Sequence, residues 1–184
     1  MSKPSVSSCS VALAALLLAA PAAHAGDRAG DGAFFDSLAG AWSGPGEIVA
    51  GKYKGTRFSC ALDGESLRAG RGEELGMELA GKCRVGLFSQ TIAARVERRG
   101  RGYTGAFLDG ARGKGLDVVA GNVDGNRLTV GMEREDLKGA MVAKIKDNGR
   151  LAVTVSVRVG DELVPVIGMD LSRRLDATAT GSIR

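Results

Sequence analysis

The stretch LAVTVSVRV at residues 151–159 decides the fold, because it alternates aliphatic residues with small or polar ones over its whole length. Its odd-numbered positions are Leu or Val, and its even-numbered positions are Ala, Thr, Ser and Arg. Successive side chains of a β-strand point to opposite faces of the sheet. The alternation therefore predicts a strand with one buried face and one solvated face.

Turn sequences flank this strand on both sides. Asp147-Asn148-Gly149 precedes it and Gly160-Asp161 follows it, and Asp124-Gly125-Asn126 forms a similar cluster further back. Asn, Asp and Gly tolerate the positive φ angles that tight hairpins require. Strands joined by such short turns are expected to pair with their sequence neighbours in an antiparallel meander.

Further strands are predicted along almost the whole chain, which has 28 glycines and only four prolines. The apolar patterns place them at 47–50, 53–62, 75–83, 87–96, 103–108, 116–123, 127–134, 139–146, 151–159 and 163–171. A single helical turn is expected at 33–38, capped by Asp31. An all-β, up-and-down barrel of eight to ten strands at residues 33–175 is predicted, because closure removes exposed strand edges.

The N-terminus has the pattern of a secretory signal peptide. Lys3 supplies a positive charge, residues 11–20 are apolar, and Ala23-His24-Ala25 resembles a cleavage site. We expect residues 1–25 to be removed, residues 26–32 to form a flexible leader, and 176–184 to form a flexible tail. The expected location is periplasmic or secreted.

Cleavage after Ala25 would leave Cys60 and Cys83 as the only cysteines, because Cys9 would be lost. Two cysteines in an exported chain predict a disulfide. Closing this loop would stabilise the fold by roughly 3 kcal/mol, through restriction of the unfolded chain.

The segment Leu38-Ala39-Gly40-Ala41-Trp42-Ser43-Gly44 resembles the entry to the first strand of calycin-type barrels, the group of lipocalins, avidins and nitrobindin-like proteins. The resemblance implies a helical turn followed by a G-x-W strand, with Trp42 plugging one end of the barrel. It also implies that a basic residue after the last strand, Arg173 or Arg174, covers the indole. Nitrobindin-like proteins hold haem through histidine, so the resemblance does not extend to haem here.

Catalytic and metal chemistry is restricted once His24 is removed. Histidine-dependent nucleophile pairs and histidine zinc sites are excluded, and no calcium-loop spacing is present. No metal and no cofactor are expected, and the sequence favours a protein without enzymatic activity. The carboxylate clusters at 73–74, 133–136 and 161–162 leave a carboxylate-dependent hydrolase as a third possibility.

The densest charged feature consists of Arg95, Arg98, Arg99 and Arg101. These arginines are candidates for contact with anionic groups on an envelope lipid or polysaccharide, and the alternative is a hairpin loop kept soluble by its charge. Nucleic acid is not an expected partner outside the cytoplasm. A membrane-spanning barrel is not expected either, because the chain has few aromatic residues and carries Lys144, Lys146 and Arg158 within predicted strands.

These features predict an exported, non-enzymatic barrel that binds a small apolar or anionic lipid-like ligand in the envelope. The alternative is a periplasmic interaction module with a filled core, such as an envelope-assembly factor or a protease inhibitor that contacts an envelope protein. An interior cavity of a few hundred Å³ would favour the ligand binder. A solid core with an exposed apolar patch would favour the interaction module.

Overall fold

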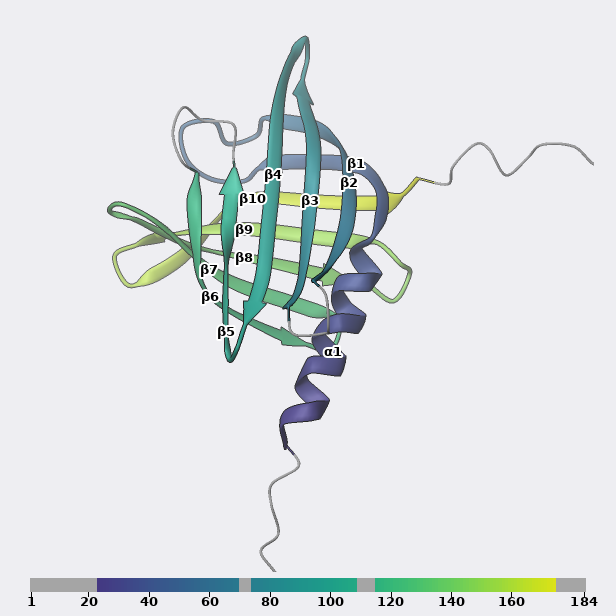
Figure 1. The fold of residues 1–184 in the computed structure, drawn as a ribbon. Coiled ribbons are helices and arrows are strands. Elements are labelled where there is room, and N and C mark those ends of the chain that lie inside the picture. Colours follow the sequence, from purple (N-terminus) through teal and green to yellow (C-terminus); the bar gives the residue numbers. More distant parts are fainter. Residues whose placement is uncertain (1–22, 70–73, 109–114, 175–184) are drawn as a thin grey trace, which may run out of the picture.

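The computed structural model describes residues 23–69, 74–108 and 115–174, which form one helix and a closed antiparallel barrel (Figure 1). The predicted tail at 176–184 and nearly all of the predicted signal peptide lie outside these residues. The elements are α1 (Ala23–Leu38), β1 (Gly40–Ile48), β2 (Arg57–Ala69), β3 (Glu74–Val85), β4 (Phe88–Arg99), β5 (Gly102–Leu108), β6 (Leu116–Asp124), β7 (Arg127–Arg134), β8 (Leu137–Ile145), β9 (Leu151–Val159) and β10 (Glu162–Arg173).

Each strand pairs with the next one in sequence, and β10 pairs back with β1 to close the barrel. All of these pairings are antiparallel, so the predicted meander and its closure into a barrel are confirmed. The predicted turns between β6 and β7, β8 and β9, and β9 and β10 contain Gly125, Gly149 and Gly160, each with a positive φ angle.

The first hairpin differs from the prediction of strands at 47–50 and 53–62. β1 begins at Gly40 and ends at Ile48, and a wider loop at 49–56 precedes β2. Gly51 and Gly55 both have positive φ angles, which take the backbone out of the extended conformation. The apolar pattern misses the earlier part of β1 because its glycines and Pro45 give no alternation, whereas the resemblance to calycin-type barrels places Trp42 on this strand, as the structure does.

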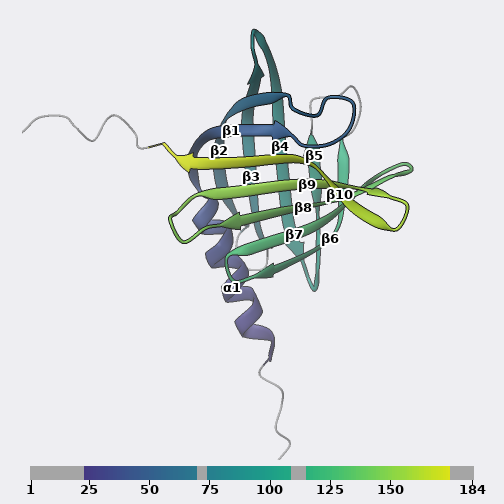
Figure 2. The same cartoon turned by 180° about the vertical axis from the view of Figure 1, so that it is seen from behind.

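The inward-facing positions of the strands form the core. On β9, Leu151, Val153 and Val155 are buried as the alternation predicts, but Val159 is 61% exposed. Val159 lies beyond the last pairing of β9 with β8, in the part of β9 that extends with β10 into a projecting hairpin (Figures 1 and 2). The core is therefore dense at one end of the barrel and open at the other.

Helix α1 covers the closed end and packs against β2, β3 and β6. Its side chains Phe34, Phe35 and Leu38 are buried. The helix is longer than the single turn expected, since residues 26–32 are part of it. Asp31 lies inside the helix rather than capping it, and its side chain is buried.

Asp31 links the helix to the barrel. Its carboxylate accepts a hydrogen bond of 2.6 Å from the Tyr103 hydroxyl and forms an ion pair with Arg98. Burial, followed by the hydrogen bond to Asp31, raises the pKa of Tyr103, so the phenol stays protonated and continues to donate. A buried carboxylate is tolerated here because its charge is paired and hydrogen-bonded.

Trp42 and Arg173 complete the closed end. Trp42 is fully buried, and its Nε1 donates a hydrogen bond of 2.8 Å to the Leu38 carbonyl. The Arg173 guanidinium carbon lies 4.5 Å from the centroid of the indole ring. Arg173 also donates to the carbonyls of Ser37 and Ala39, at the C-terminus of α1. Arg174 instead pairs with Asp63 at 3.1 Å, so Arg173 is the residue that covers the indole.

Candidate ligand-binding cavity

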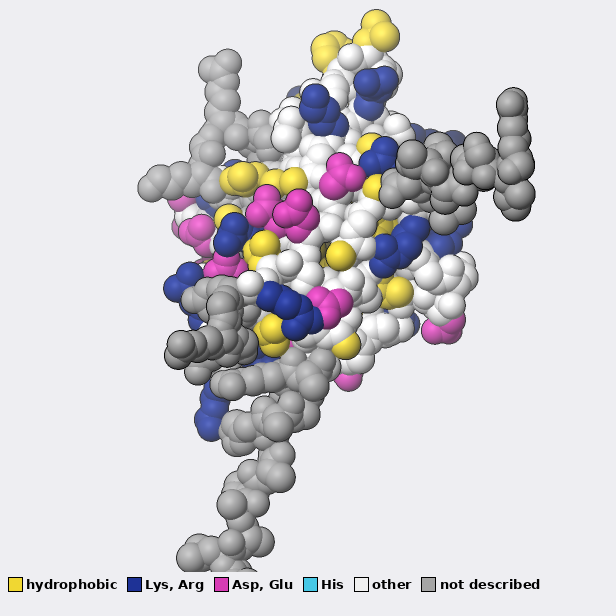
Figure 3. Space-filling view, turned by 45° about the vertical axis from the view of Figure 1, so that its right-hand side comes forward, with side chains coloured by type: hydrophobic (Ala, Val, Ile, Leu, Met, Phe, Trp, Pro, Cys, Tyr) yellow, Lys and Arg dark blue, Asp and Glu magenta, His cyan; other side chains and the backbone are white. Residues whose placement is uncertain are grey.

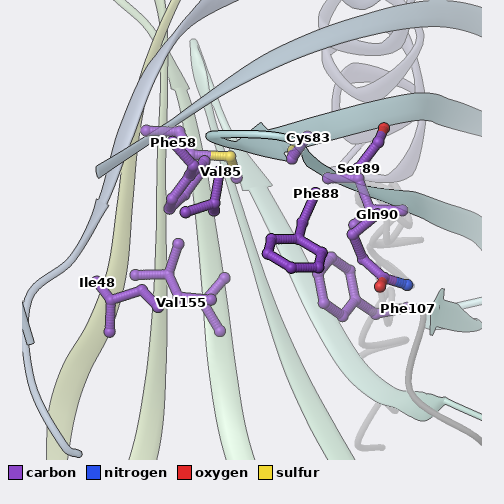
Figure 4. Close-up of a pocket in the computed structure, with 12 residues that line it drawn as sticks. Ile48, Phe58, Cys83, Val85, Phe88, Ser89, Gln90, Phe107 and Val155 are labelled. Carbon is purple, nitrogen blue, oxygen red and sulfur yellow. The ribbon is translucent and has the colours of Figure 1, made fainter. Parts of the chain in front are cut away.

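A cavity of about 310 Å³ occupies the end of the barrel away from α1, and it opens to solvent. Figure 4 shows the side chains that line it. Its lining is formed by Ile48, Phe58, Cys83, Val85, Phe88, Ser89, Gln90, Ile92, Phe107, Val155, Ile167 and Met169. These residues come from β1, β2, β3, β4, β5, β9 and β10.

The strand alternation explains why these side chains meet. Val155 continues the inward series of Leu151 and Val153 on β9. On β10 the register shifts between Pro165 and Ile167, and beyond this irregularity Ile167 and Met169 both line the cavity. Phe58 lies against Gly46, where any Cβ atom would be only 2.2 Å from the aromatic ring. Glycine at position 46 therefore leaves the space that the Phe58 ring fills in the cavity wall.

The floor of the cavity lies at the middle of the barrel. Ile92, Phe107 and Met169 line both the cavity and a smaller void of about 30 Å³ beneath it. A void of this size accommodates about one water molecule, and its walls are apolar. The half of the barrel next to α1 is therefore filled by its own side chains, and only the open half has room for a ligand.

Among the residues that the structure describes, those that line the cavity include no charged one, and the polar side chains among them are Ser89 and Gln90. Figure 4 places the Gln90 amide beside the ring of Phe107, whereas the Ser89 hydroxyl points away from the other side chains. The Gln90 amide makes no hydrogen bond to another residue in the described part of the chain. Gln90 can therefore donate to and accept from a polar group of a ligand.

The predicted disulfide is confirmed, and it contributes to the cavity wall. Cys60 on β2 and Cys83 on β3 are directly opposite each other in the register, with a sequence separation of 23. Cys60 is buried, and its sulfur lies 3.8 Å from the sulfur of Met169. Cys83 lines the cavity, so the bridge joins two adjacent strands on their inner face.

The four arginines of the basic cluster lie on β4 and its turn to β5, at the opposite end from the cavity mouth. Arg95 is hydrogen-bonded to Glu97 and Glu78, and Arg99 is 3.3 Å from Glu97. The hydrogen bond from Arg95 is the largest cause that lowers the pKa of Glu97. Arg98 is held by Asp31, and Arg101 lies in the turn. The structure therefore does not join this cluster to the cavity, and its contact with an anionic group stays a prediction.

The described carboxylate clusters, at 133–136 and 161–162, do not line the cavity, and the predicted cluster at 73–74 lies outside the residues whose side chains the structure describes. Glu133 on β7 forms an ion pair of 3.6 Å with Lys138, and Asp161 and Glu162 are exposed at the β9–β10 turn. Asp170, on the outer surface of β10, is bound by Lys146 at 2.7 Å and Arg150 at 2.8 Å. The hydrogen bond from Lys146 is the main cause that lowers the pKa of Asp170. In the described ranges, no three His, Cys, Asp or Glu side chains are grouped to hold a metal ion.

The sequence alone named no cavity residue as a ligand contact. The alternation at 151–159 already indicates that the Val155 side chain points inward. That the inner faces of β1, β4 and β10 surround one cavity depends on barrel closure, which no local pattern shows. A comparison of the chain with known protein families finds no match, and a comparison with curated proteins finds none either. Among residues 23–69, 74–108 and 115–174, no helix is long and apolar enough to cross a membrane.

Proposed function

We propose that this protein is an exported, calycin-like barrel without enzymatic activity, which binds one small apolar or lipid-like ligand in the cavity. The observation that carries the proposal is the apolar cavity of about 310 Å³, open at one end of a barrel whose other end is closed by α1, Trp42 and Arg173. Ligand pockets are concave, mostly apolar and at least about 300 Å³ in volume. The disulfide agrees with export to an oxidising compartment.

The lining indicates which ligand chemistry fits. A charged group would lose its hydration among Phe107, Ile92 and Met169, and the described lining offers it no charged partner, so the buried part of the ligand is apolar. The polar part of the ligand lies near Gln90, which has unused hydrogen-bonding capacity. A single acyl chain with a neutral or weakly polar head, or a compact apolar metabolite, meets both conditions.

The other two hypotheses from the sequence have less support. An interaction module with a filled core does not explain the hollow half of the barrel. A carboxylate-dependent hydrolase requires two carboxyl groups across a cleft, and the cavity lining that the structure describes contains no Asp or Glu. The cavity therefore favours ligand binding over both.

The proposal is tested with the neutral fluorescent probe N-phenyl-1-naphthylamine, whose emission rises in apolar surroundings. Val155 is buried and lines the cavity, so Val155→Phe fills part of the space that the probe needs. The matched control is Thr154→Phe, which adds an aromatic ring on the outer face of the same strand. We expect saturable binding by the wild type and the control, displacement by fatty alcohols, and at least about tenfold weaker binding by Val155→Phe.

Circular dichroism and the emission of Trp42, the single tryptophan of the chain, report whether each variant is folded. The proposal fails if the folded wild type does not bind the probe. It also fails if folded Val155→Phe binds the probe as tightly as the wild type does.

A further inference from the structure

The exposed hydrophobic residues of the described chain are concentrated at the open end of the barrel. All of the large ones except Val119 lie in or next to the turns at this end: Val49, Tyr53, Val85, Leu87, Phe88, Leu108, Leu137, Val159 and Leu163. Each exposed apolar side chain carries a hydration cost, so their concentration around one opening indicates a surface that meets an apolar phase.

The hairpin of β3 and β4 carries the most exposed members of this set. It projects beyond the rest of the barrel in both ribbon views (Figures 1 and 2). Leu87 at its turn is 100% exposed and Phe88 is 84% exposed. Gly86 makes the tight turn possible with a φ angle of 56°. A narrow protruding tip is poorly shaped to cover a flat protein surface, whereas it can insert between lipid headgroups.

The charges on the β3–β4 hairpin next to this tip are positive, whereas the β7–β8 and β9–β10 turns of the same end carry acidic residues. Lys82 and Arg84 are exposed on the outer face of β3, and neither forms an ion pair with a residue that the structure describes. Figure 3 shows Lys and Arg side chains just below the apolar tip. Lys52 and Lys54 lie in the exposed β1–β2 loop at the same end, where Glu47 is paired with Arg57. An apolar tip with basic residues at its base matches an anionic lipid surface.

From these observations we infer that the open end of the barrel docks on an anionic lipid bilayer through its β3–β4 side, with residues 85–88 inserted among the lipids and the acidic β9–β10 turn outside the contact. Val85 and Phe88 also line the cavity, so docking would place the cavity mouth against the membrane. The proposed function gives this docking a purpose, which is exchange of a lipid-like ligand with the bilayer. The docking itself rests only on the surface and does not require the cavity to bind a ligand.

The docking is tested with Leu87→Trp and vesicles that contain phosphatidylglycerol with brominated acyl chains. Leu87 does not line the cavity, and Trp42 is buried at the far end, so the introduced indole reports on the tip alone. The matched control is Leu163→Trp, at the β9–β10 turn beside Asp161 and Glu162. We expect a blue shift and at least about twofold quenching at position 87, little change at 163, and a much weaker effect with phosphatidylcholine alone.

Lys82→Gln combined with Arg84→Gln in the Leu87→Trp background should weaken vesicle binding several-fold. No quenching at position 87, equal quenching at 163, or equal binding to neutral vesicles would each overturn the proposal. Light scattering provides a further test. If the wild type forms a dimer and Leu87→Gln dissociates it, a second copy of the chain covers the tip and the proposal is overturned. Val155→Phe should bind the vesicles as the wild type does, even if it no longer binds N-phenyl-1-naphthylamine. The two experiments therefore test docking and ligand binding separately.

Discussion

At the scale of single residues, Asp31 shows how a charge can be built into the closed end of the barrel. It is 4% exposed, and it brings together Arg98 from β4 and Tyr103 from β5. Its partners come from strands far away in the sequence, at separations of 67 and 72 residues. The network therefore fixes where α1 sits on the barrel rather than stabilising the helix itself.

We predict that Asp31→Asn lowers the free energy of unfolding by about 3 kcal/mol, because it leaves the Arg98 guanidinium largely buried without its counter-charge. Tyr103→Phe is the comparison variant, since it removes one hydrogen bond and keeps the ring, and it should cost about 1 kcal/mol. Urea denaturation followed by circular dichroism measures both values. Equal stability of Asp31→Asn and the wild type would show that the buried ion pair is not needed.

At the scale of elements, α1 acts as the lid of the closed end. Its C-terminal carbonyls accept hydrogen bonds from Trp42 on β1 and Arg173 on β10. A cation near the C-terminus of a helix also interacts favourably with the helix dipole. Because Trp42 and Arg173 are opposite each other in the register, one contact joins the first strand, the last strand and the helix.

Arg173→Ala should therefore loosen the lid and expose the indole. We predict a loss of about 2 kcal/mol in the free energy of unfolding, from the lost hydrogen bonds and the lost cation–π contact. The emission of Trp42 should shift to longer wavelength as water reaches the ring. Arg174→Ala is the matched control, because Arg174 pairs with the exposed Asp63, and it should leave the spectrum unchanged. An unshifted spectrum for Arg173→Ala would contradict the assignment of Arg173 as the cover.

At the scale of the whole molecule, the barrel has one solid half and one hollow half. The solid half, under α1, contains the fully buried side chains Trp42, Leu62, Leu128 and Leu151. The hollow half contains the cavity and has exposed apolar turns. The disulfide lies in the wall of this half, between β2 and β3.

Reduction of the disulfide should lower the free energy of unfolding by about 3 kcal/mol, the loop-entropy value for a separation of 23 residues. The measurement is urea denaturation with and without dithiothreitol. The double variant Cys60→Ala, Cys83→Ala should be less stable than the oxidised wild type and insensitive to the reductant. If the wild type is equally stable in both conditions, the bridge does not stabilise the fold.

The sequence by itself determined the strands, the turns and the meander. The alternation at 151–159 needs only local geometry, and the Asp, Asn and Gly clusters specify the hairpins that join neighbouring strands. The cysteine count predicted the bridge between Cys60 and Cys83, which the structure contains. The apolar pattern places the first strand too late because Gly44, Pro45 and Gly46 hide its period, whereas the resemblance to calycin-type barrels places Trp42 on it.

Only the tertiary structure decided which half of the barrel is hollow, and where Asp31 and the arginines lie. The inward faces of β1, β4 and β10 look alike in sequence whether they face a filled core or a cavity, since both need apolar residues. The volume left between them depends on barrel closure, on the space that Gly46 gives to Phe58, and on α1 covering only one end. These are long-range packing relations, and no local pattern of residues encodes the space that they leave.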